Sequence, residues 1–412
     1  MEKVIAVIDM KSFYASCECA CRHLDPFSTP LVCCDPYRSS SSIVMSTTPF
    51  LKRKYGVPSI CRRRDLPQIP GMIFAVPRMS YYLQVSAKIV SIFLDYVAEE
   101  DLHVYSVDES FLNLGPYLNL YHCTPEQIVK RIQATIKTKL GVVATAGIGP
   151  NMFLAKIALD NEGKNKEPYL AHWEYKDVPT KLWGISPITK IWGISDGISS
   201  HLARIGIRSL YELAHASDDI LLKEFGIIGF QLKNLANGID ESDIQQKHVP
   251  EGVSLTLGQT LRRDYLPQEA TLLLREMNDD LSERLRGEGY LAAKVSVWIS
   301  YGKRGSFAKQ MTLPIATDDS ETLYEALREV FFFGEVLPIR ALGICYSRLS
   351  RSPNEQISLF LDSETQDKRR SLNTSIDHIK SLYGKNSVLR CSSLLKSSTA
   401  RIRHEQIGGH KQ

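Results

Sequence analysis

Apolar residues near the N-terminus follow the periods of strands and helices. A continuous Val/Ile-rich run over residues 3–9 ends in Asp9, which predicts a buried strand with a carboxylate at its C-terminal edge. Residues 102–114 alternate apolar and polar around Asp108 and Glu109, which predicts a hairpin with carboxylates at its tip. A further strand is predicted over 142–149, with helices over 82–99, 125–140 and 152–159. These elements predict one α+β sheet domain.

The remainder of the chain changes character several times. Residues 20–77 are richer in Pro and Arg and predict a small inserted lobe. Residues 177–240 are apolar and helical with repeated Gly turns, and a mixed α/β region follows over 250–349. After the linker signal Ser-Arg-Ser-Pro-Asn at 350–354, the tail is basic and rich in serine. The pattern therefore predicts several domains and a tail.

Composition excludes several classes of protein. The chain has 412 residues, 43% hydrophobic and 23% charged, which is ordinary for globular domains and excludes collagen-like or mostly disordered chains. No stretch of about 20 apolar residues is present, and nine irregularly spaced cysteines do not form a disulfide framework. We therefore expect a cytoplasmic protein. Net charge is only +4, although residues 351–412 hold 11 basic against 6 acidic residues, so any polyanion must bind local patches.

The three carboxylates at predicted strand ends carry candidate chemistry. Asp108 and Glu109 repel each other and are costly to desolvate without a cation. Carboxylate oxygens suit Mg²⁺ or Mn²⁺, and two such ions would support phosphoryl transfer. A solvated hairpin turn is the alternative, and strand-then-acid spacing by itself favours that alternative.

Longer motifs around these acids are more specific. The segments Asp-Met-Lys-Ser-Phe-Tyr-Ala-Ser-Cys-Glu at 9–18 and Ser-Val-Asp-Glu-Ser-Phe-Leu at 106–112 closely resemble the two catalytic motifs of Y-family DNA polymerases, with the first most like the UmuC-like branch of lesion-bypass enzymes. Further segments resemble the family in the same order, at 47–57, 147–160, 192–214 and 253–349. Their order and separation make coincidence an inadequate explanation.

The resemblance implies a multidomain α+β right-hand polymerase. It places a ferredoxin-like palm at 1–19 and 78–168, small fingers at 20–77, and a helical thumb with a helix-hairpin-helix at 169–242. An α/β little finger would follow at 243–349, and a flexible basic tail at 350–412.

The family's site residues carry over position by position. Asp9, Asp108 and Glu109 would hold two Mg²⁺ ions (Mn²⁺ is possible), with the Met10 carbonyl as a further ligand. Tyr14 would be the steric gate beneath the incoming sugar, beside Phe13; its alternative is a core aromatic. The resemblance also assigns substrate binding to Thr47, Arg53 and Lys156, the last two gripping the triphosphate. Phe50 stands where many relatives have Tyr.

DNA contacts are expected in two places. Gly193 and Ser195 lie in a segment resembling a helix-hairpin-helix, whose backbone N–H groups bind phosphate without reading sequence; a plain helix–turn–helix packing unit is the alternative. In the little finger, a basic face would contact the DNA backbone, formed by Arg262, Arg263, Lys294, Lys303, Arg304 and Lys309.

The tail carries one short motif. Gln356-Ile-Ser-Leu359-Phe360 resembles the peptide by which bacterial polymerases bind the sliding clamp. Two apolar anchors and one amide suit such docking, whereas an additional edge strand is the alternative.

These observations predict a template-directed, monomeric polymerase that performs translesion synthesis on primer–template DNA with dNTPs. One alternative is an inactive scaffold bound to DNA and clamp, against which the retention of all three carboxylates argues. A two-metal nucleotidyl cyclase is a second alternative, but it has no use for a thumb or little finger.

Overall fold

The computed structural model describes residues 3–37, 39–246, 250, 252–331, 336–351 and 363–411. It divides into two compact units, Met1–Lys247 and His248–Gln412, each described here by itself. Within the described residues, no helix has both the length and the apolar character needed to cross a membrane.

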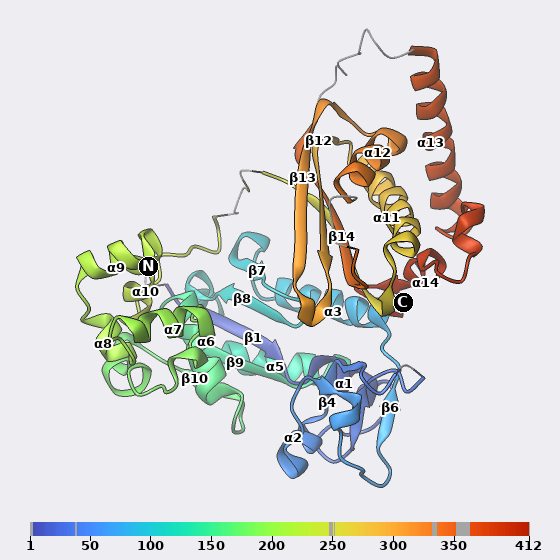
Figure 1. The fold of residues 1–412 in the computed structure, drawn as a ribbon. Helices are drawn as coiled ribbons and strands as arrows, with labels where there is room; N and C mark the ends of the chain where they lie inside the picture. The colour runs from blue at the N-terminus through green and yellow to red at the C-terminus, as the bar shows by residue number, and fades with distance from the viewer. Residues whose placement is uncertain are drawn as a thin grey trace. The chain divides into compact units, whose positions relative to one another are not determined.

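The first unit is built on a five-stranded sheet (Figure 1). Its strand order is β10-β9-β1-β8-β7, antiparallel except for the parallel pair β9 and β10. The strands are β1 (Ile5–Met10), β7 (Leu102–Val104), β8 (Glu109–Asn113), β9 (Ala144–Gly149) and β10 (Leu170–His172). The helices packed with them are α1 (Phe13–Ala20), α3 (Met79–Leu94), α5 (Pro125–Leu140) and α6 (Met152–Ala158). The predicted strands, hairpin and helices are thereby confirmed.

Strand β1 is apolar except at Asp9, because both of its faces are covered. Ala6, Ile8 and Met10 pack with α3 and α5, whereas Ile5 and Val7 pack with Phe111 and α6 on the opposite face. Side chains alternate along a strand, so Asp9 points to the α6 side of the sheet. The sequence period therefore decides which helix faces the carboxylate.

The inserted lobe predicted at 20–77 has its own small sheets. Strands β2 (Leu31–Cys33), β4 (Ser46–Thr47) and β6 (Ile73–Ala75) pair in the order β4-β2-β6, and β3 (Ile43–Val44) pairs with β5 (Cys61–Arg62). Helix α2 (Pro49–Tyr55) carries three basic residues in its last turn and ends at Gly56, whose φ of 64° is left-handed. Such an end suits glycine, which has no Cβ to clash. The lobe thus presents cations on one short helix.

Four short helices form the predicted thumb: α7 (Asp196–Arg204), α8 (Leu210–Ala214), α9 (Asp218–Phe225) and α10 (Ile227–Ala236). The predicted boundary between palm and thumb at 168/169 is wrong by one strand, because β10 pairs with β9 in the main sheet. Strand β10 has only three residues, which is too short for a recognisable alternation of apolar and polar side chains in the sequence.

The second unit is a four-stranded antiparallel sheet in the order β11-β14-β12-β13. Its strands are β11 (Leu255–Tyr265), β12 (Leu291–Ser300), β13 (Ser306–Thr317) and β14 (Ile339–Ser350). Helices α11 (Pro267–Gly287) and α12 (Ser320–Phe331) bury their apolar sides against it in one core. The predicted mixed α/β region over 250–349 is confirmed.

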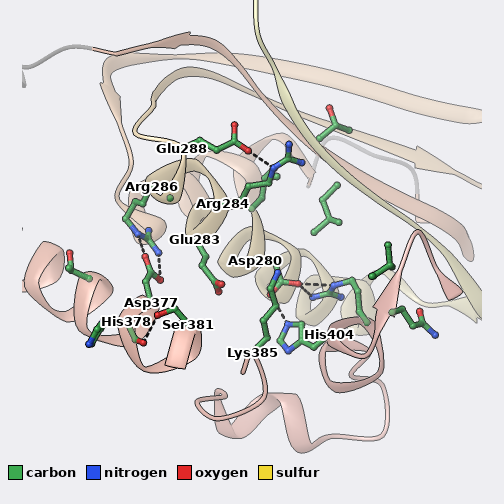
Figure 2. A pocket seen from close by; sticks show the side chains of 18 residues that line it. Asp280, Glu283, Arg284, Arg286, Glu288, Asp377, His378, Ser381, Lys385 and His404 are labelled. Carbon is green, nitrogen blue, oxygen red and sulfur yellow. Dashed lines mark hydrogen bonds and ion pairs between the residues drawn. The ribbon is translucent and has the colours of Figure 1, made fainter. Parts of the chain in front are cut away.

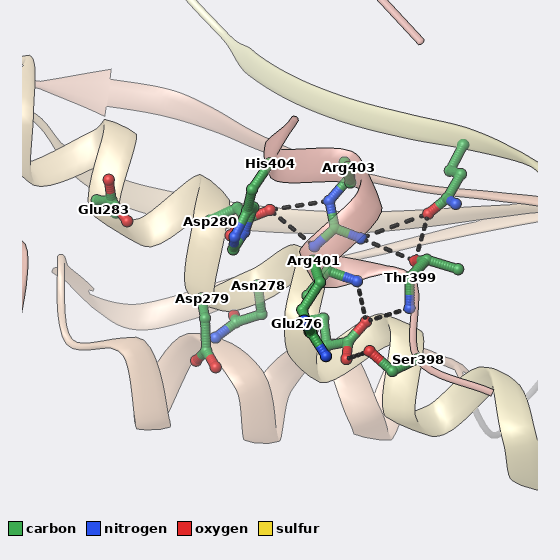
Figure 3. A network of polar contacts seen from close by, with 12 residues as sticks. Glu276, Asn278, Asp279, Asp280, Glu283, Ser398, Thr399, Arg401, Arg403 and His404 are labelled. Atoms are coloured by element: carbon green, nitrogen blue, oxygen red, sulfur yellow. Dashed lines mark hydrogen bonds and ion pairs between the residues drawn. The ribbon is translucent and has the colours of Figure 1, made fainter. Parts of the chain in front are cut away.

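The tail prediction is wrong for residues 363–411, which fold onto this unit. Helix α13 (Ser363–Tyr383), α14 (Ala400–His404) and a hairpin of β15 (Gln406–Ile407) and β16 (His410–Lys411) follow one another. The carboxylate of Glu276, on α11, accepts hydrogen bonds from Ser398 Oγ at 2.6 Å, Thr399 N at 3.1 Å and Ala400 N at 3.0 Å. Figure 3 shows Ser398 and Thr399 beside Glu276. The basic tail is thus matched to acids on α11. The clamp-like motif at 356–360 lies outside the described residues.

Ion pairs dominate the remaining contacts of the tail. Asp280 accepts from Arg403 Nε at 2.8 Å and from His404 Nε2 at 2.8 Å. Burial by itself would raise the pKa of Asp280, but the hydrogen bond from His404 and the charge of Arg403 hold it below its usual range. Arg286 grips Asp377 with two nitrogens, at 2.6 and 2.9 Å, beside a cavity of about 900 Å³ (Figure 2).

We predict that Glu276→Ala lowers the free energy of unfolding by about 2–3 kcal/mol, because three donors lose a buried acceptor. Hydrogen exchange should quicken at the Thr399 and Ala400 amides. Glu364→Ala is the matched control, since Glu364 is 75% exposed and pairs with Lys368 four residues along its own helix; it should cost less than about 0.5 kcal/mol. Equal losses of unfolding free energy in the two variants would mean that the contacts of Glu276 do not hold the tail on this unit.

Candidate active site

Three carboxylates meet at the ends of β1 and β8. Asp9 and Glu109 are directly opposed in the antiparallel register, so their side chains share one face. The N–H of Met10 donates to the carbonyl of Asp108 at 2.9 Å, and Ser106 Oγ donates to Asp108 Oδ1 at 2.9 Å. The strand pairing therefore brings together acids that lie about a hundred residues apart in the chain.

Two lysines neutralise these acids. Lys156 Nζ lies 2.7 Å from Glu109 Oε1, and both side chains are less than 10% exposed. Lys164 Nζ lies 3.1 Å from Asp9 Oδ2. Asp160 sits between the two lysines, 3.4 Å from Lys156 and 2.9 Å from Lys164. Acids and lysines form one continuous network.

The electrostatics of Asp9 reflect this crowding. Burial is the largest cause and raises the pKa of Asp9 to about 6, with Asp108 and Glu109 adding to the rise and Lys164 opposing it. Burial would lower the pKa of Lys164, but the charges of Asp9 and Asp160 raise it above its usual value. Asp9 is therefore an acid that an additional cation would readily keep ionised.

The donor set fits a divalent cation in its chemistry. Carboxylates are hard oxygen ligands of the kind Mg²⁺ uses, and their mutual repulsion disfavours the ionised state in the absence of a cation. In the arrangement of the described residues, no three His, Cys, Asp or Glu side chains already converge as ligands. Lysine ammonium groups occupy positions beside Asp9 and Glu109 instead.

Close packing of α6 on β9 sets the positions of these lysines. A Cβ on Gly147 would lie 2.1 Å from the carbonyl oxygen of Ala155, and one on Gly149 would lie 2.6 Å from the Ala155 nitrogen. Only glycine permits this approach. Helix α6 begins at Asn151, whose Oδ1 accepts from Leu154 N at 2.8 Å, and it runs into the π-helical turn η4 (Leu159–Gly163) before Lys164.

A second group of cations lies beside the acids. The charges of Lys11, Lys52, Arg53 and Lys164 act on one another, and burial followed by these neighbours lowers the pKa of Lys11. Burial and the charge of Lys164 also lower the pKa of Lys52, while Asp9 opposes the fall. Four cations within electrostatic reach repel one another, so the group is suited to a polyanion.

Three residues predicted to contact substrate make contacts within the protein. Lys156 is only 7% exposed and is engaged by Glu109 and Asp160, so its ammonium is a counter-charge to the acids. Thr47 is fully buried and its hydroxyl donates to the carbonyl of Pro58 at 3.1 Å. Phe13 is 2% exposed in the core against the sheet. In each case the side chain that was predicted to contact substrate contacts other residues of the protein.

Lys164 and Lys11 were missed by the sequence predictions. Lys156, Asp160 and Lys164 follow one another at intervals of four residues, which places them on one helical face. That spacing was the available signal for Lys164. The sequence carries no such signal for Lys11, because the position of Lys11 beside Lys52 and Arg53 depends on how the inserted lobe folds against the sheet.

Tyr14 lies at the edge of this site and is supported from beneath. It is half-buried, with its ring 4.9 Å from that of Tyr82. Tyr82 is fully buried and donates to Glu18 Oε1 at 2.8 Å, and Glu18 is also bound by Arg78 through two nitrogens at 3.0 Å. This chain of contacts fixes the Tyr14 ring while leaving part of it accessible.

The predicted DNA contacts of the thumb lie at a helix start. Ser195 is the N-cap of α7 and its hydroxyl accepts from Ile198 N at 3.4 Å, while Gly193 has a φ of 93°. Ser195 stands where a second glycine is usual in such a motif, and its side chain caps the helix. Its φ of −78° is one that any residue can adopt. In the first half of the predicted hairpin, a 3₁₀ turn (Ile188–Lys190) replaces a full helix.

The predicted basic face of the second unit is partly paired. Arg263 binds Glu269 at 2.5 Å, and Arg304 lies 3.3 Å from Asp264, which brings the 262–265 and 302–304 segments together. Arg262 and Lys303 are exposed. Lys309 is directly opposite Val297, whose side chain is buried in the core with α11 and α12, so it is on the helix side of the sheet. It therefore does not share the face of Lys294, whose register partner is Ser347.

Comparison with known families finds two matches. The model of the impB/mucB/samB family matches residues 8–160, and that of the impB/mucB/samB family C-terminal domain matches residues 252–359. UvrX of Bacillus subtilis strain 168, named for UV-damage repair, is 34% identical over 417 residues, covering 99% of this chain and 98% of that protein. DNA polymerase IV 2 of the same organism is 33% identical over 417 residues, with 99% of each chain covered.

A solved structure shares the fold. The Y-family DNA polymerase chimera Dbh-Dpo4(243-245)-Dbh superposes with a TM-score of 0.67 at 18% identity. It covers 85% of this chain and 100% of its own.

The contact between Lys164 and Asp9 yields a prediction on titration. Lys164→Ala should raise the pKa of Asp9 above its present value of about 6, by about one unit or more, because an opposite charge at 3.1 Å is lost. Carboxyl ¹³C NMR of Asp-labelled protein would measure it. Lys156→Ala is the control, since Lys156 contacts Glu109 and Asp160 but not Asp9. An Asp9 titration that moves equally in both variants would refute the pairing.

Proposed function

This chain belongs to the impB/mucB/samB family of Y-family DNA polymerases and is a DNA-directed DNA polymerase, and we propose that it performs translesion synthesis by two-metal nucleotidyl transfer from a dNTP to a primer 3′-hydroxyl. The observation that carries this proposal is the meeting of Asp9, Asp108 and Glu109 at adjacent strand ends, beside a group of four cations of which Lys164 also pairs with Asp9. An inactive scaffold would have no need for such costly acids.

The acids would hold the catalytic ions. Asp9, Asp108 and Glu109 would bind two Mg²⁺, or Mn²⁺, with the Met10 carbonyl as a further ligand. Such ions supply positive charge that activates an attacking oxygen and stabilises a leaving one. Lys156 and Lys164 keep Glu109 and Asp9 neutralised before substrate arrives, so the acids remain oriented at low cost.

The cation group would hold the triphosphate. Arg53 presents a planar fork from α2, whereas Lys11, Lys52 and Lys164 are point charges on the palm side and on α2. Their mutual repulsion is relieved when an anion lies among them. This assignment keeps Arg53 from the sequence prediction and replaces Lys156 with Lys164.

Tyr14 would select the sugar. Its ring is fixed by Tyr82 and remains half-exposed beside Asp108, whose charge, after burial, raises the pKa of the Tyr14 hydroxyl. A rigid ring at this place would collide with a 2′-hydroxyl. The thumb helix start at Ser195 with Gly193, and the basic residues Arg262, Arg263, Lys303 and Arg304, would contact the DNA backbone.

Asp108→Ala tests the chemistry. We expect primer extension with Mg²⁺ and dNTPs to fall by several orders of magnitude, because removal of a metal ligand weakens electrostatic stabilisation of the transition state. Binding of primer–template should be almost unchanged, since DNA is held by remote contacts. Asp65→Ala serves as the control, since Asp65 is an acid of the inserted lobe whose side chain is 57% exposed. Extension by Asp108→Ala above about a tenth of the parent rate would refute the metal assignment.

We also propose that Gln356, Leu359 and Phe360 bind a sliding clamp, which would tether the polymerase to DNA. Changing Leu359 and Phe360 together to Ala should remove most clamp stimulation on long DNA, because tethering acts through effective concentration. Extension of a short primer without clamp should match the parent protein. Full clamp stimulation in this variant would place the docking site elsewhere.

A further inference from the structure

A column of two stacked aromatic rings with a cation at each end joins the inserted lobe to the main sheet. The Arg53 guanidinium lies 5.1 Å from the ring centre of Phe27, whose ring stacks on Tyr169 at 6.1 Å with planes 19° apart. At the other end, Lys11 Nζ lies 4.6 Å from the centre of the Tyr169 ring. Both cations belong to the group of four described above. Each end of the column therefore carries a cation of the proposed phosphate site.

Hydrogen bonds fix the same cations a second time. Arg53 Nη2 donates to the carbonyl of Phe27 at 3.3 Å, and Lys11 Nζ donates to the carbonyl of Lys164 at 2.6 Å. The face of an aromatic ring attracts a cation, and a carbonyl oxygen accepts a hydrogen bond from the cation's N–H group. The two contacts together limit the orientations that each side chain can adopt. Two long side chains that would otherwise sample many rotamers are held beside the acids.

The Phe27 end of the column is coupled to the helix that carries Arg53. The Phe27 N–H donates to Asp25 Oδ1 at 3.1 Å, which forms a tight turn. The N–H of Phe50, in the first turn of α2, donates to the carbonyl of Pro26 at 3.2 Å. Phe27 and Arg53 therefore move together as part of one lobe.

The Tyr169 end is fixed to the sheet in an unusual conformation. Tyr169 has a φ of 57°, a left-handed value that side chains with a Cβ rarely adopt. Its carbonyl accepts from Ala146 N at 2.8 Å and from Gln133 Nε2 at 3.0 Å. Strained residues persist where surrounding contacts over-determine them, and they concentrate at functional positions.

The stack is not simple filling of a core. A cavity of about 800 Å³ lies beside it, lined in part by Phe27, Gln133 and Tyr169. Phe27 is half-buried and Arg53 is exposed, whereas Tyr169 is 9% exposed. The Phe27 ring therefore gains less from burial than a core residue does, so its alignment with Tyr169 calls for another explanation.

We propose that Phe27 and Tyr169 are positioning residues for the incoming nucleotide, which hold Arg53 of the inserted lobe and Lys11 of the palm in register for the triphosphate. The inference rests on the proposed phosphate site and deepens it. The aromatic pair does not touch the substrate; it orders two cations in advance, so that less conformational entropy is lost when the anion binds.

The test is steady-state single-nucleotide insertion with the full chain. Phe27→Met and Tyr169→Met keep apolar volume but remove the aromatic face, and each should raise KM for dNTP roughly 5–20-fold with kcat changed less than about twofold. Affinity for primer–template should not change. Tyr169→Phe keeps the ring and should restore parental KM. In an Arg53→Ala background, Phe27→Met should add less than about a twofold further rise.

A matched stack provides the control for stability. Tyr117 and Tyr121 stack at 6.3 Å and 22° at a distant edge of the palm, with no cation described over either ring. Tyr121→Met should lower the melting temperature without altering KM. Leu variants at 27 and 169 serve if a Met variant does not fold.

Variants of the cations and variants of the rings distinguish a failed positioning role from a failed phosphate site. If Arg53→Ala and Lys11→Ala raise KM but the Met variants only lower the melting temperature, Phe27 and Tyr169 are structural and the inference is wrong. If Arg53→Ala and Lys11→Ala leave KM unchanged, the proposed phosphate site is itself wrong, and the inference falls with it. A change in kcat larger than that in KM would also overturn a positioning role.

Discussion

Repulsion among carboxylates at two neighbouring strand ends is the constraint on which this active site depends. Asp9 is buried beside Asp108 and Glu109, and its pKa of about 6 reflects first its burial and then the charges of these two neighbouring acids. The protein offsets that cost with Lys156 and Lys164, both from the segment that begins at α6. Helix α6 can supply them because Gly147 and Gly149 let it lie directly on β9. Backbone packing on one face of the sheet is therefore what keeps the acids ionised and oriented.

The same edge of the sheet carries acids paired with lysines and, beside them, cations that are not all paired with those acids. The acids lie at the ends of β1 and β8, and their counter-lysines lie on α6 and just after the turn that follows it, whereas Lys52 and Arg53 come from the inserted lobe on α2. Lys164 belongs to both sets, since it pairs with Asp9 and acts on Lys11 and Lys52. A site with this division can bind cations at one end and an anion at the other. Contacts between the lobe and the palm then determine how well the two ends are aligned.

The second unit shows a different way of joining elements. Its sheet and helices α11 and α12 share an apolar core, but the tail docks on α11 through buried or half-buried acids, among them Glu276 and Asp280. Polar docking of this kind is specific in geometry and contributes little net free energy, because each ion must first be desolvated. The neighbouring cavity of about 900 Å³ is consistent with an interface that is not sealed by apolar packing.

Local pattern was sufficient for much of this molecule. The apolar run ending in Asp9, the hairpin around Asp108 and Glu109, and the helix over 125–140 were predicted because strand and helix periods are properties of consecutive residues. The motif around these acids was also sufficient to identify the family. Sequence alone did not determine which cation faces which acid: Lys156 was assigned to phosphate and proved to be buried against Glu109, while Lys164 and Lys11 were overlooked. Thr47 and the folded tail were misjudged for the same reason, since the partner of a polar group is chosen by tertiary packing, and the Coulomb energy between two charges depends on their separation in space rather than along the chain.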